Sequence, residues 1–188
     1  MPRTFFRWEC LGMLFAAASG FAQRTPIRRI AAGEFSAIPP GIVAVLRTRG
    51  CTVPQPSWDV TPNSPRPSLQ NAIRGEFFAK GQEAWAVLCS IGESSSILVF
   101  RDRAGARPQE IAKREDRIFL QGDGQGKMVY SREIDAVGGK YIMDHFHAYG
   151  GPEPPPIDHQ GIDDVFLGKA SVTYYWYKGS WRQLTGAD

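Results

Sequence analysis

The sequence predicts an α+β fold that is rich in β-strand, mostly antiparallel, with two short helices. Three observations lead to this class. Residues 83–91 are apolar on both faces of a strand, which is typical of a strand at the centre of a sheet. Turn residues at 92–95 let 96–102 return antiparallel to it. Apolar residues in 40–49 and in 138–149 recur with the period of a helix.

The first half of the chain is expected to contain one helix and one long loop. Ile42 and Leu46 share a helical face within 40–49, and Gly50 stands where a C-terminal cap belongs. Residues 52–68 contain five prolines, which remove backbone donors and fix the backbone angle. We therefore expect this stretch to be a surface loop and not a strand.

The second half is expected to alternate strands with turns around the second helix. Glycine-rich residues 122–126 are typical of a tight hairpin turn. In 170–177 the side chains divide into two alternating sets, as a strand requires. Across the whole chain, the strands that we expect are 69–78, 83–91, 96–102, 117–121, 127–132, 164–167, 170–177 and 181–184.

The N-terminal residues 1–22 have the order of features of a secretory signal peptide. Two arginines precede an apolar run over 10–22, which ends in small residues suited to cleavage. This run is shorter than the roughly 20 residues of a membrane-spanning helix. We expect export to the periplasm or the medium, no transmembrane span, and a single globular domain over 23–188.

The charge of the chain argues against two kinds of partner. Lys and Arg number 22 against 19 Asp and Glu, for a formal net charge of +3, and the basic residues are scattered. A small net charge without a basic cluster does not indicate nucleic acid or an anionic membrane as partner.

Removal of 1–22 would leave two cysteines, Cys51 and Cys89. An even number of cysteines in an oxidising compartment favours a disulfide between them. Two other interpretations stay open, a catalytic Cys89 and a pair of free buried thiols. The apolar run around Cys89 argues for burial, whereas a catalytic thiolate needs exposure.

Two segments resemble the small exported FG-GAP-like (VCBS-type) repeat proteins. They are 73–90, IRGEFFAKGQEAWAVLCS, and 159–184, HQGIDDVFLGKASVTYYWYKGSWRQL. The first is similar to a degenerate repeat, with Gly75, Phe77 and Gly81 in place. The second is similar to the closing strands of these proteins. The resemblance implies a β-rich extracellular module built from strands and turns.

The resemblance does not extend to the calcium loop of that family. Ca²⁺ binds six to eight oxygen ligands, and the family supplies them from acidic and amide side chains. Here Glu76 replaces the first aspartate, while Phe78, Lys80 and Ala84 occupy other ligand positions. We therefore expect no calcium, and no other cofactor is indicated.

Polar residues before and within the expected strand 164–167 could form a small cluster. A histidine next to carboxylates can bind a divalent metal, but aspartates in a polar loop more commonly cap turns. His145 and His147 lie about 200° apart on the expected helix, so they cannot bind one ion together. The cluster candidates are Asp158, His159, Asp163 and Asp164.

The aromatic run 174–177 is the best candidate for a ligand surface. Neighbouring residues of a strand point to opposite faces, so half of the run belongs to the core. We expect Tyr175 and Tyr177 to face outward, with Trp181 nearby, where their rings could stack on a base or a sugar.

No motif of a known enzyme class is complete in this sequence. Residues 121–128 do not satisfy the phosphate-loop pattern, and neither G-x-S-x-G nor H-E-x-x-H occurs. We expect a non-catalytic binding or interaction module of the cell envelope, with an unknown protein or glycan partner. The alternatives are a small thiol- or metal-dependent envelope hydrolase and an inhibitor of a secreted hydrolase.

Overall fold

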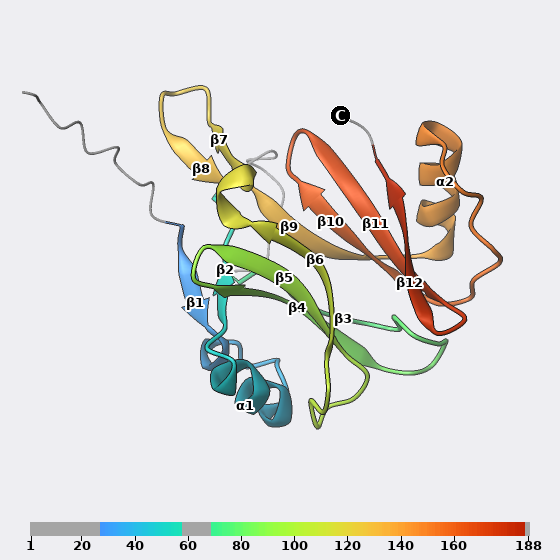
Figure 1. The fold of residues 1–188 in the computed structure, drawn as a ribbon, viewed down its shortest axis with the longest axis horizontal. Helices are drawn as coiled ribbons and strands as arrows, with labels where there is room; N and C mark the ends of the chain where they lie inside the picture. The colour runs from blue at the N-terminus through green and yellow to red at the C-terminus, as the bar shows by residue number, and fades with distance from the viewer. Residues whose placement is uncertain (1–26, 58–68, 187–188) are drawn as a thin grey trace, which may run out of the picture.

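A computed structural model describes residues 27–57 and 69–186 of the chain (Figure 1). Two antiparallel sheets pack face to face, and one helix covers the outer face of each. Figure 1 shows helix α1 at one end of the molecule and helix α2 at the opposite end. The expected β-rich α+β class is confirmed. The expected signal peptide, 1–22, lies outside the described residues.

The elements follow one another along the chain with short connections. Both predicted helices are present, and the 3₁₀ turns η1 and η2 are additional. The elements are β1 (Arg29–Ala31), η1 (Ala32–Glu34), α1 (Pro40–Thr48), β2 (Thr52–Pro54), β3 (Ala72–Gly75), β4 (Ala84–Ile91), β5 (Ser94–Phe100), β6 (Gln109–Glu115), η2 (Asp116–Phe119), β7 (Leu120–Gly122), β8 (Met128–Tyr130), β9 (Arg132–Val137), α2 (Gly139–Tyr149), β10 (Gly161–Phe166), β11 (Ala170–Tyr177) and β12 (Ser180–Thr185).

The first sheet has the order β1-β2-β4-β5-β6, and β3 also pairs with β4. Its central strands are apolar on both faces because both faces are covered. Trp85, Val87 and Cys89 pack toward α1, while Ala86 and Leu88 pack toward the second sheet. This arrangement confirms the prediction that 83–91 is central.

The second sheet has the order β12-β11-β10-β9 and is antiparallel throughout. On its inner face, Ile134 and Ile162 join the core between the sheets. On its outer face, Tyr175 and Leu184 pack against Ile142 of α2. The molecule is therefore built of four layers, in the order helix, sheet, sheet, helix.

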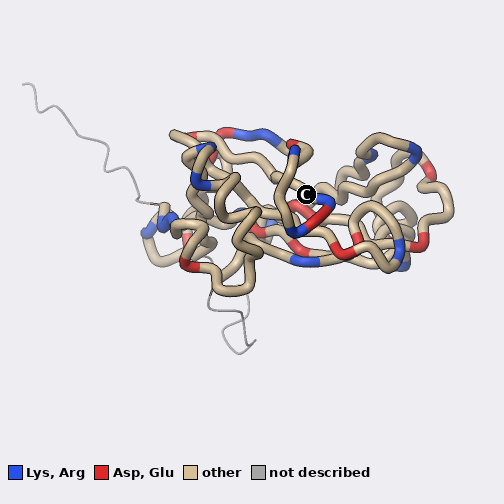
Figure 2. Tube along the Cα trace, turned by 90° about the horizontal axis from the view of Figure 1, so that it is seen from below, with Lys and Arg blue, Asp and Glu red and all other residues tan. Residues whose placement is uncertain are grey.

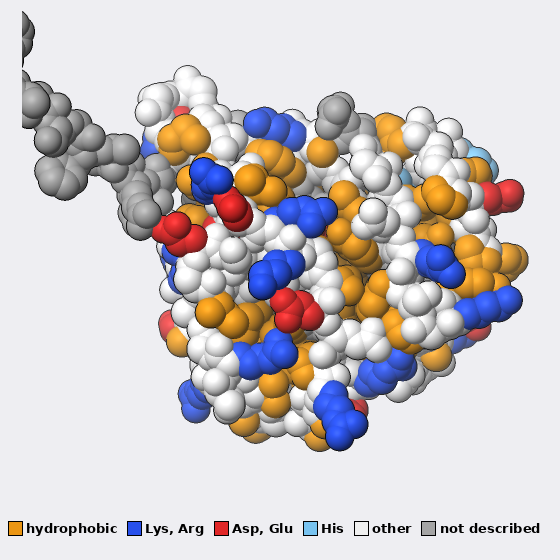
Figure 3. Space-filling view, viewed as in Figure 1, with side chains coloured by type: hydrophobic (Ala, Val, Ile, Leu, Met, Phe, Trp, Pro, Cys, Tyr) orange, Lys and Arg blue, Asp and Glu red, His pale blue; other side chains and the backbone are white. Residues whose placement is uncertain are grey.

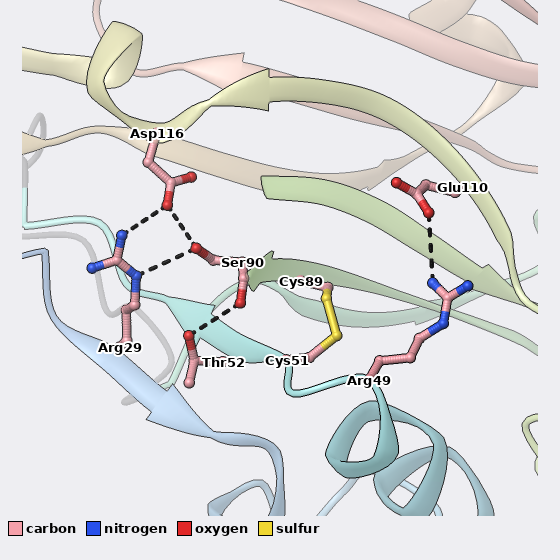
Figure 4. The surroundings of a disulfide bond; sticks show 8 residues. All are labelled: Arg29, Arg49, Cys51, Thr52, Cys89, Ser90, Glu110 and Asp116. Atoms are coloured by element: carbon pink, nitrogen blue, oxygen red, sulfur yellow. Dashed lines mark hydrogen bonds and ion pairs between the residues drawn. A yellow bond between two sulfur atoms is a disulfide. The ribbon is translucent and has the colours of Figure 1, made fainter. Parts of the chain in front are cut away.

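The disulfide between Cys51 and Cys89 is confirmed, with its Cα atoms 5.1 Å apart. Figure 4 shows that it joins the chain after α1 to the central strand β4. It spans 38 positions of sequence and fixes the α1 layer against the first sheet. Cys89 is buried, with 2% of its surface exposed.

Several local predictions were incomplete. Part of the expected proline-rich loop is β2, which lies between β1 and β4 and ends at Pro54. A short strand tolerates proline at its end because no further ladder donor is needed there. The edge strand β6 was not expected, since its sequence QEIAKRE is mostly polar. The expected strand 117–121 is mostly the 3₁₀ turn η2.

The hairpin expected at 122–126 is confirmed. β7 and β8 pair antiparallel, with Gly122 opposite Met128. The Asp123 side chain accepts hydrogen bonds from the backbone N–H groups of Gln125 and Lys127, at 2.8 and 3.1 Å. These bonds lower the pKa of the Asp123 carboxyl. None of the helices in the described ranges is long and apolar enough to cross a membrane.

The two long sides of the sandwich are closed in different ways. On one side, the Asn71 amide bridges to β9, because its Oδ1 accepts from Ile134 N at 3.0 Å and its Nδ2 donates to Arg132 O at 3.1 Å. On the other side, Trp181 Nε1 of β12 donates to Gln109 Oε1 of β6 at 2.8 Å. The second side, between β6 and β12, holds the candidate site.

Candidate binding surface

Three aromatic side chains meet at one end of the sandwich. Phe78 comes from the β3–β4 loop, Trp176 from β11 and Trp181 from β12. Their ring centroids lie 5.3 to 5.6 Å apart, and every pair is edge to face. Phe78 is buried, whereas both indoles are partly exposed. This geometry is the one that aromatic quadrupoles favour. We call Phe78, Trp176 and Trp181 the aromatic cluster.

A two-residue hairpin positions the two indoles. Trp176 lies directly opposite Trp181 in the β11–β12 ladder. Lys178 and Gly179 connect the strands, and both have positive φ, at 46° and 85°. Two such residues form the type I′ turn, whose twist matches that of the flanking strands. The register of this turn therefore fixes the contact between the indoles.

The guanidinium of Arg101 lies on top of the aromatic cluster. Its central carbon is 3.8 Å from the Phe78 ring centroid and 4.8 Å from that of Trp176. Arg101 is exposed and directly follows β5. Among the described residues, it has no ion pair and donates no hydrogen bond. The two rings therefore hold a cation whose polar edge stays free.

Hydrophobic side chains continue from the cluster along the β6–β12 side of the sandwich. Ile111 and Ala112 of β6 are partly buried there, against the same core as the two indoles. Figure 3 shows hydrophobic side chains gathered where β6 and β12 approach each other. The apolar surface is thus a strip between two edge strands.

The surroundings of the aromatic cluster are basic. The β5–β6 loop carries Arg103 and Arg107 beside Arg101. Figure 3 shows basic side chains along the lower right margin, where this loop lies. Figure 2 shows that residues of both charges are scattered along the whole trace. In the β11–β12 hairpin, Lys178 lies 5.2 Å from the Tyr177 ring and Arg182 is opposite Tyr175, so both belong to the outer face of the second sheet. The positive charge next to the aromatic cluster therefore comes from the β5–β6 loop.

The acidic residues near this surface already have partners. Asp102 Oδ1 accepts hydrogen bonds from Ala104 N and Gly105 N, at 2.9 and 3.0 Å, and so shapes the β5–β6 loop. Glu83 lies 3.5 Å from Arg74 and 3.8 Å from Arg103. Neither carboxylate neutralises Arg101.

A polar pocket of about 280 Å³ lies on the other side of the β3–β4 loop. Gln160 clamps this loop, because its Oε1 accepts from Glu76 N at 2.9 Å and its N–H donates to Glu76 O at 3.0 Å. A Cβ atom on Gly75 would lie 2.7 Å from the ring of the fully buried Phe77 and 2.8 Å from Gln160 Oε1, so the packing of the Phe77 ring favours glycine here. The pocket is lined by Arg74, Gly75, Glu76, Gly81, Glu83 and Gln160.

The expected surface of Tyr175, Tyr177 and Trp181 does not exist as one face. Tyr175 is buried, with 3% exposed, because α2 covers the outer face of the second sheet. Tyr177 lies on that outer face, whereas Trp181 lies on the inner face opposite Trp176. The alternation of the strand was predicted correctly, but its outward face was wrong. The partner of Trp181 is Trp176.

The expected cluster of Asp158, His159, Asp163 and Asp164 is divided by the fold. Asp163 points outward, where it accepts hydrogen bonds from Tyr141 at 2.7 Å and Thr173 at 2.8 Å. Asp164 points inward and pairs with Arg132. Asp158 is exposed, and His159 Nδ1 lies 3.0 Å from Gln160 O. In the described part of the chain, no three His, Cys, Asp or Glu side chains are grouped to hold a metal ion.

Partial burial and the contact with Asp163 together raise the pKa of Tyr141 to about 12. Partial burial is the main cause, and the hydrogen bond to the Asp163 carboxylate is the second. The hydroxyl of Tyr141 is thereby held as a neutral donor. In the row Tyr141, His145 and Tyr149 on α2, successive rings lie 5.9 and 5.0 Å apart.

The other end of the sandwich holds a buried arginine that the sequence analysis did not identify. Arg132 is fully buried and donates two hydrogen bonds of 2.8 Å to Asp164. It also donates to Ser95 Oγ at 2.8 Å and to Ala112 O at 2.7 Å, so it joins both sheets. Burial lowers the pKa of Arg132, but the bonds and charge of Asp164 outweigh this and raise it.

The chain matches no protein-family model, and comparison with the curated proteins and with the solved structures finds no match either.

Proposed function

We propose that this chain is an exported, non-catalytic binding module of the cell envelope, and that the aromatic cluster with Arg101 is its ligand surface. The observation that carries the proposal is the pair of partly exposed indoles beneath a stacked cation without a polar partner. Rigid aromatic rings give contact area at small entropic cost, and a free guanidinium adds a specific polar contact.

Export is part of the proposal. The disulfide supports an oxidising compartment. The order of features in 1–22 supports secretion, and the FG-GAP-like resemblance, which we also retain as a proposal, supports an extracellular module. Intact mass of protein recovered from the envelope or medium should lack about 22 residues. Full-length protein in the cytoplasm would contradict export.

A thiol hydrolase is less well supported than a binding module. Cys89 is bonded to Cys51 and buried, so its sulfur is not a free thiolate. A metal hydrolase would need ligands from the polar cluster, whose two aspartates on β10 point to opposite faces of the sheet. An inhibitor of a secreted hydrolase remains the second candidate, because the same exposed aromatic end could contact a protein.

Co-sedimentation with insoluble envelope fractions tests the binding function. Mature protein should pellet with purified cell-wall polysaccharide, and Trp181→Ala should reduce the bound fraction by about tenfold or more. Tyr149→Ala is the matched control, since Tyr149 is 54% exposed on α2, away from the cluster. Both variants should first be shown to have melting temperatures close to that of the native protein. Equal binding by native protein and Trp181→Ala would contradict the proposed surface.

A further inference from the structure

Arg101 gives the proposed ligand surface a chemical preference. We propose that the surface binds a carboxylated glycan, a polysaccharide with uronic acid residues, and that Arg101 binds its carboxylate. This inference rests on the proposed function and specifies the ligand of the same surface.

Arg101 is held in place but not neutralised. Its guanidinium carbon lies 3.8 and 4.8 Å from the centroids of the Phe78 and Trp176 rings. Its N–H groups donate no hydrogen bond within the described residues, so they remain available to a ligand. Arg74 and Arg103 differ, because they share the carboxylate of Glu83. The Arg101 guanidinium is therefore available to bind a ligand, unlike an arginine that is part of a structural ion pair.

A guanidinium beside partly exposed indole rings suits a ligand that carries both a carboxylate and a sugar ring. A planar guanidinium presents parallel N–H donors that match the two oxygens of a carboxylate. Next to it, the partly exposed indoles offer flat faces on which the C–H groups of a pyranose ring can pack. A uronic acid carries the carboxylate and the pyranose ring in one unit. The adjacent aromatic and cationic groups thus match the two parts of one sugar residue.

The size of the surface distinguishes a glycan from a protein partner. A stable protein interface buries about 800 Å² on each partner. Here two partly exposed indoles and one guanidinium form the centre of the surface. A centre of this size favours single sugar units, repeated along a chain, over a folded partner.

The charge around the cluster agrees with an anionic chain. Arg101, Arg103 and Arg107 follow one another closely in the β5–β6 loop, while Asp102 and Glu83 are already bonded. A polyanion passing over the cluster would meet the positive charge of this loop. Such binding should weaken as the salt concentration rises, since exposed charges are screened within about 10 Å at 0.1 M.

Two forms of one polysaccharide test the inference. Polygalacturonate carries free carboxylates, and its highly methyl-esterified form has the same backbone without most of the charge. Tryptophan fluorescence of the mature protein should report tighter binding of polygalacturonate, by about tenfold, at low salt. Arg101→Gln should abolish this difference, and Arg101→Lys should restore only part of it, since lysine lacks the planar donor pair. Arg117→Gln is the control, because Arg117 is an exposed arginine of η2 at the opposite end of the sandwich, and it should change affinity less than twofold.

The other outcomes of this experiment would overturn different parts of the proposal. Equal affinity for the acid and its ester would overturn the carboxylate preference and leave the envelope-binding module standing. Preferential binding of poly-glutamate would overturn the glycan class and favour an acidic protein segment. Failure of both polysaccharides to bind would overturn this inference. The proposed function would then be decided by the sedimentation experiment with Trp181→Ala. An equal loss of affinity in Arg117→Gln and Arg101→Gln would show only diffuse charge attraction.

Discussion

Arg132 and Arg101 lie at opposite ends of the same sandwich and use the same side chain differently. Both guanidinium groups stack on aromatic rings, Arg132 on Phe119 at 4.5 Å and Arg101 on Phe78 at 3.8 Å. Arg132 is fully buried and bonds to Asp164, Ser95 and Ala112. Arg101 is exposed and, within the described residues, bonds to no polar group.

The difference shows which arginine the fold requires. A buried charge without partners is costly, so the sandwich surrounds Arg132 with acceptors from three strands. An exposed guanidinium keeps its water, so Arg101 can be left without a partner at small cost to stability. Two arginines that look equivalent in the sequence are therefore structural in one case and available for binding in the other.

The largest effect is expected from breaking the Arg132–Asp164 pair. Arg132→Met should lower the free energy of unfolding by about 3–5 kcal/mol, because it leaves the Asp164 carboxylate buried without its cation. Urea denaturation followed by circular dichroism measures this change. The cost is a large fraction of the about 5–15 kcal/mol that stabilises a typical domain.

A second variant separates the lost pair from lost packing. Arg132→Met combined with Asp164→Leu removes both charges, and replacement of a whole buried pair by apolar residues is often neutral or stabilising. We expect the double variant to be more stable than Arg132→Met alone. A double variant that is equally unstable would show that the remaining bonds, to Ser95 and Ala112, carry the stability.

The disulfide should have the next largest effect and should act on stability alone. It closes 38 positions of sequence, and the chain-entropy estimate for such a loop is about 4 kcal/mol. Replacing Cys51 and Cys89 together with alanine should lower the melting temperature clearly. Since the bridge lies on the α1 side of the first sheet, polysaccharide binding at a temperature where the variant is folded should be unchanged. A lost affinity in folded protein would show that the two regions are coupled.

The fold could be predicted from the sequence where one pattern determines one structure. The doubly apolar run at 84–91 could only be a covered strand, and Lys178 and Gly179 between alternating residues gave the β11–β12 hairpin. The pair Cys51 and Cys89 followed from their number and position. In these cases local patterning and tertiary structure agree.

Other elements depend on contacts that the sequence does not show. β6 is a polar edge strand whose bulge, with Ala112 at φ 56°, directs a carbonyl to Arg132. Such a strand has no apolar alternation to identify it. Asn71, likewise, joins β3 to β9 through its side chain, with φ at 69°.

The candidate site was predicted only in part, because it also depends on contacts that the sequence does not show. Trp181 was selected from the aromatic run, but its grouping with Tyr175 assumed that one face of β11 was open. Both faces are covered, by α2 on one side and by the first sheet on the other. Phe78 comes from the β3–β4 loop and Arg101 from the end of β5. Neither carries a local signal, so only the packed sheets bring them to Trp176.

The Tyr141–Asp163 contact is less buried than Arg132 and more buried than Arg101. It predicts that the free energy of unfolding depends on pH. The folded pKa of Tyr141 is about 12, above the ordinary value of 10. The folded state therefore favours the neutral phenol. Its stabilising contribution is complete below about pH 10 and is lost as the pH rises toward about 12. Tyr141→Phe should be less stable than native protein at pH 8.

The measurement is the difference between the two proteins across that range. Urea midpoints of native protein and Tyr141→Phe should approach each other between about pH 10 and pH 12 as Tyr141 ionises beside the Asp163 carboxylate. Other tyrosines, including the buried Tyr130 whose pKa is also raised by burial, affect both proteins equally. A constant difference at all pH values would show that this hydroxyl does not titrate with folding.

The smallest effect on stability is expected at Arg101. The size of this effect shows whether Arg101 is a structural residue like Arg132 or is free for a ligand. Arg101→Ala removes two cation–ring contacts at an exposed position, where each is worth about 0.5–1 kcal/mol, and no hydrogen bond. Arg101→Met keeps part of the contact with the rings and should cost less than Arg101→Ala. Urea denaturation of both variants, beside Arg132→Met, measures the contrast. If Arg101→Ala cost as much as Arg132→Met, Arg101 would be a structural residue that holds the β5–β6 loop on the aromatic cluster. A loss of about 2 kcal/mol or less, together with lost selectivity for polygalacturonate, would show that the fold leaves this arginine free for a ligand.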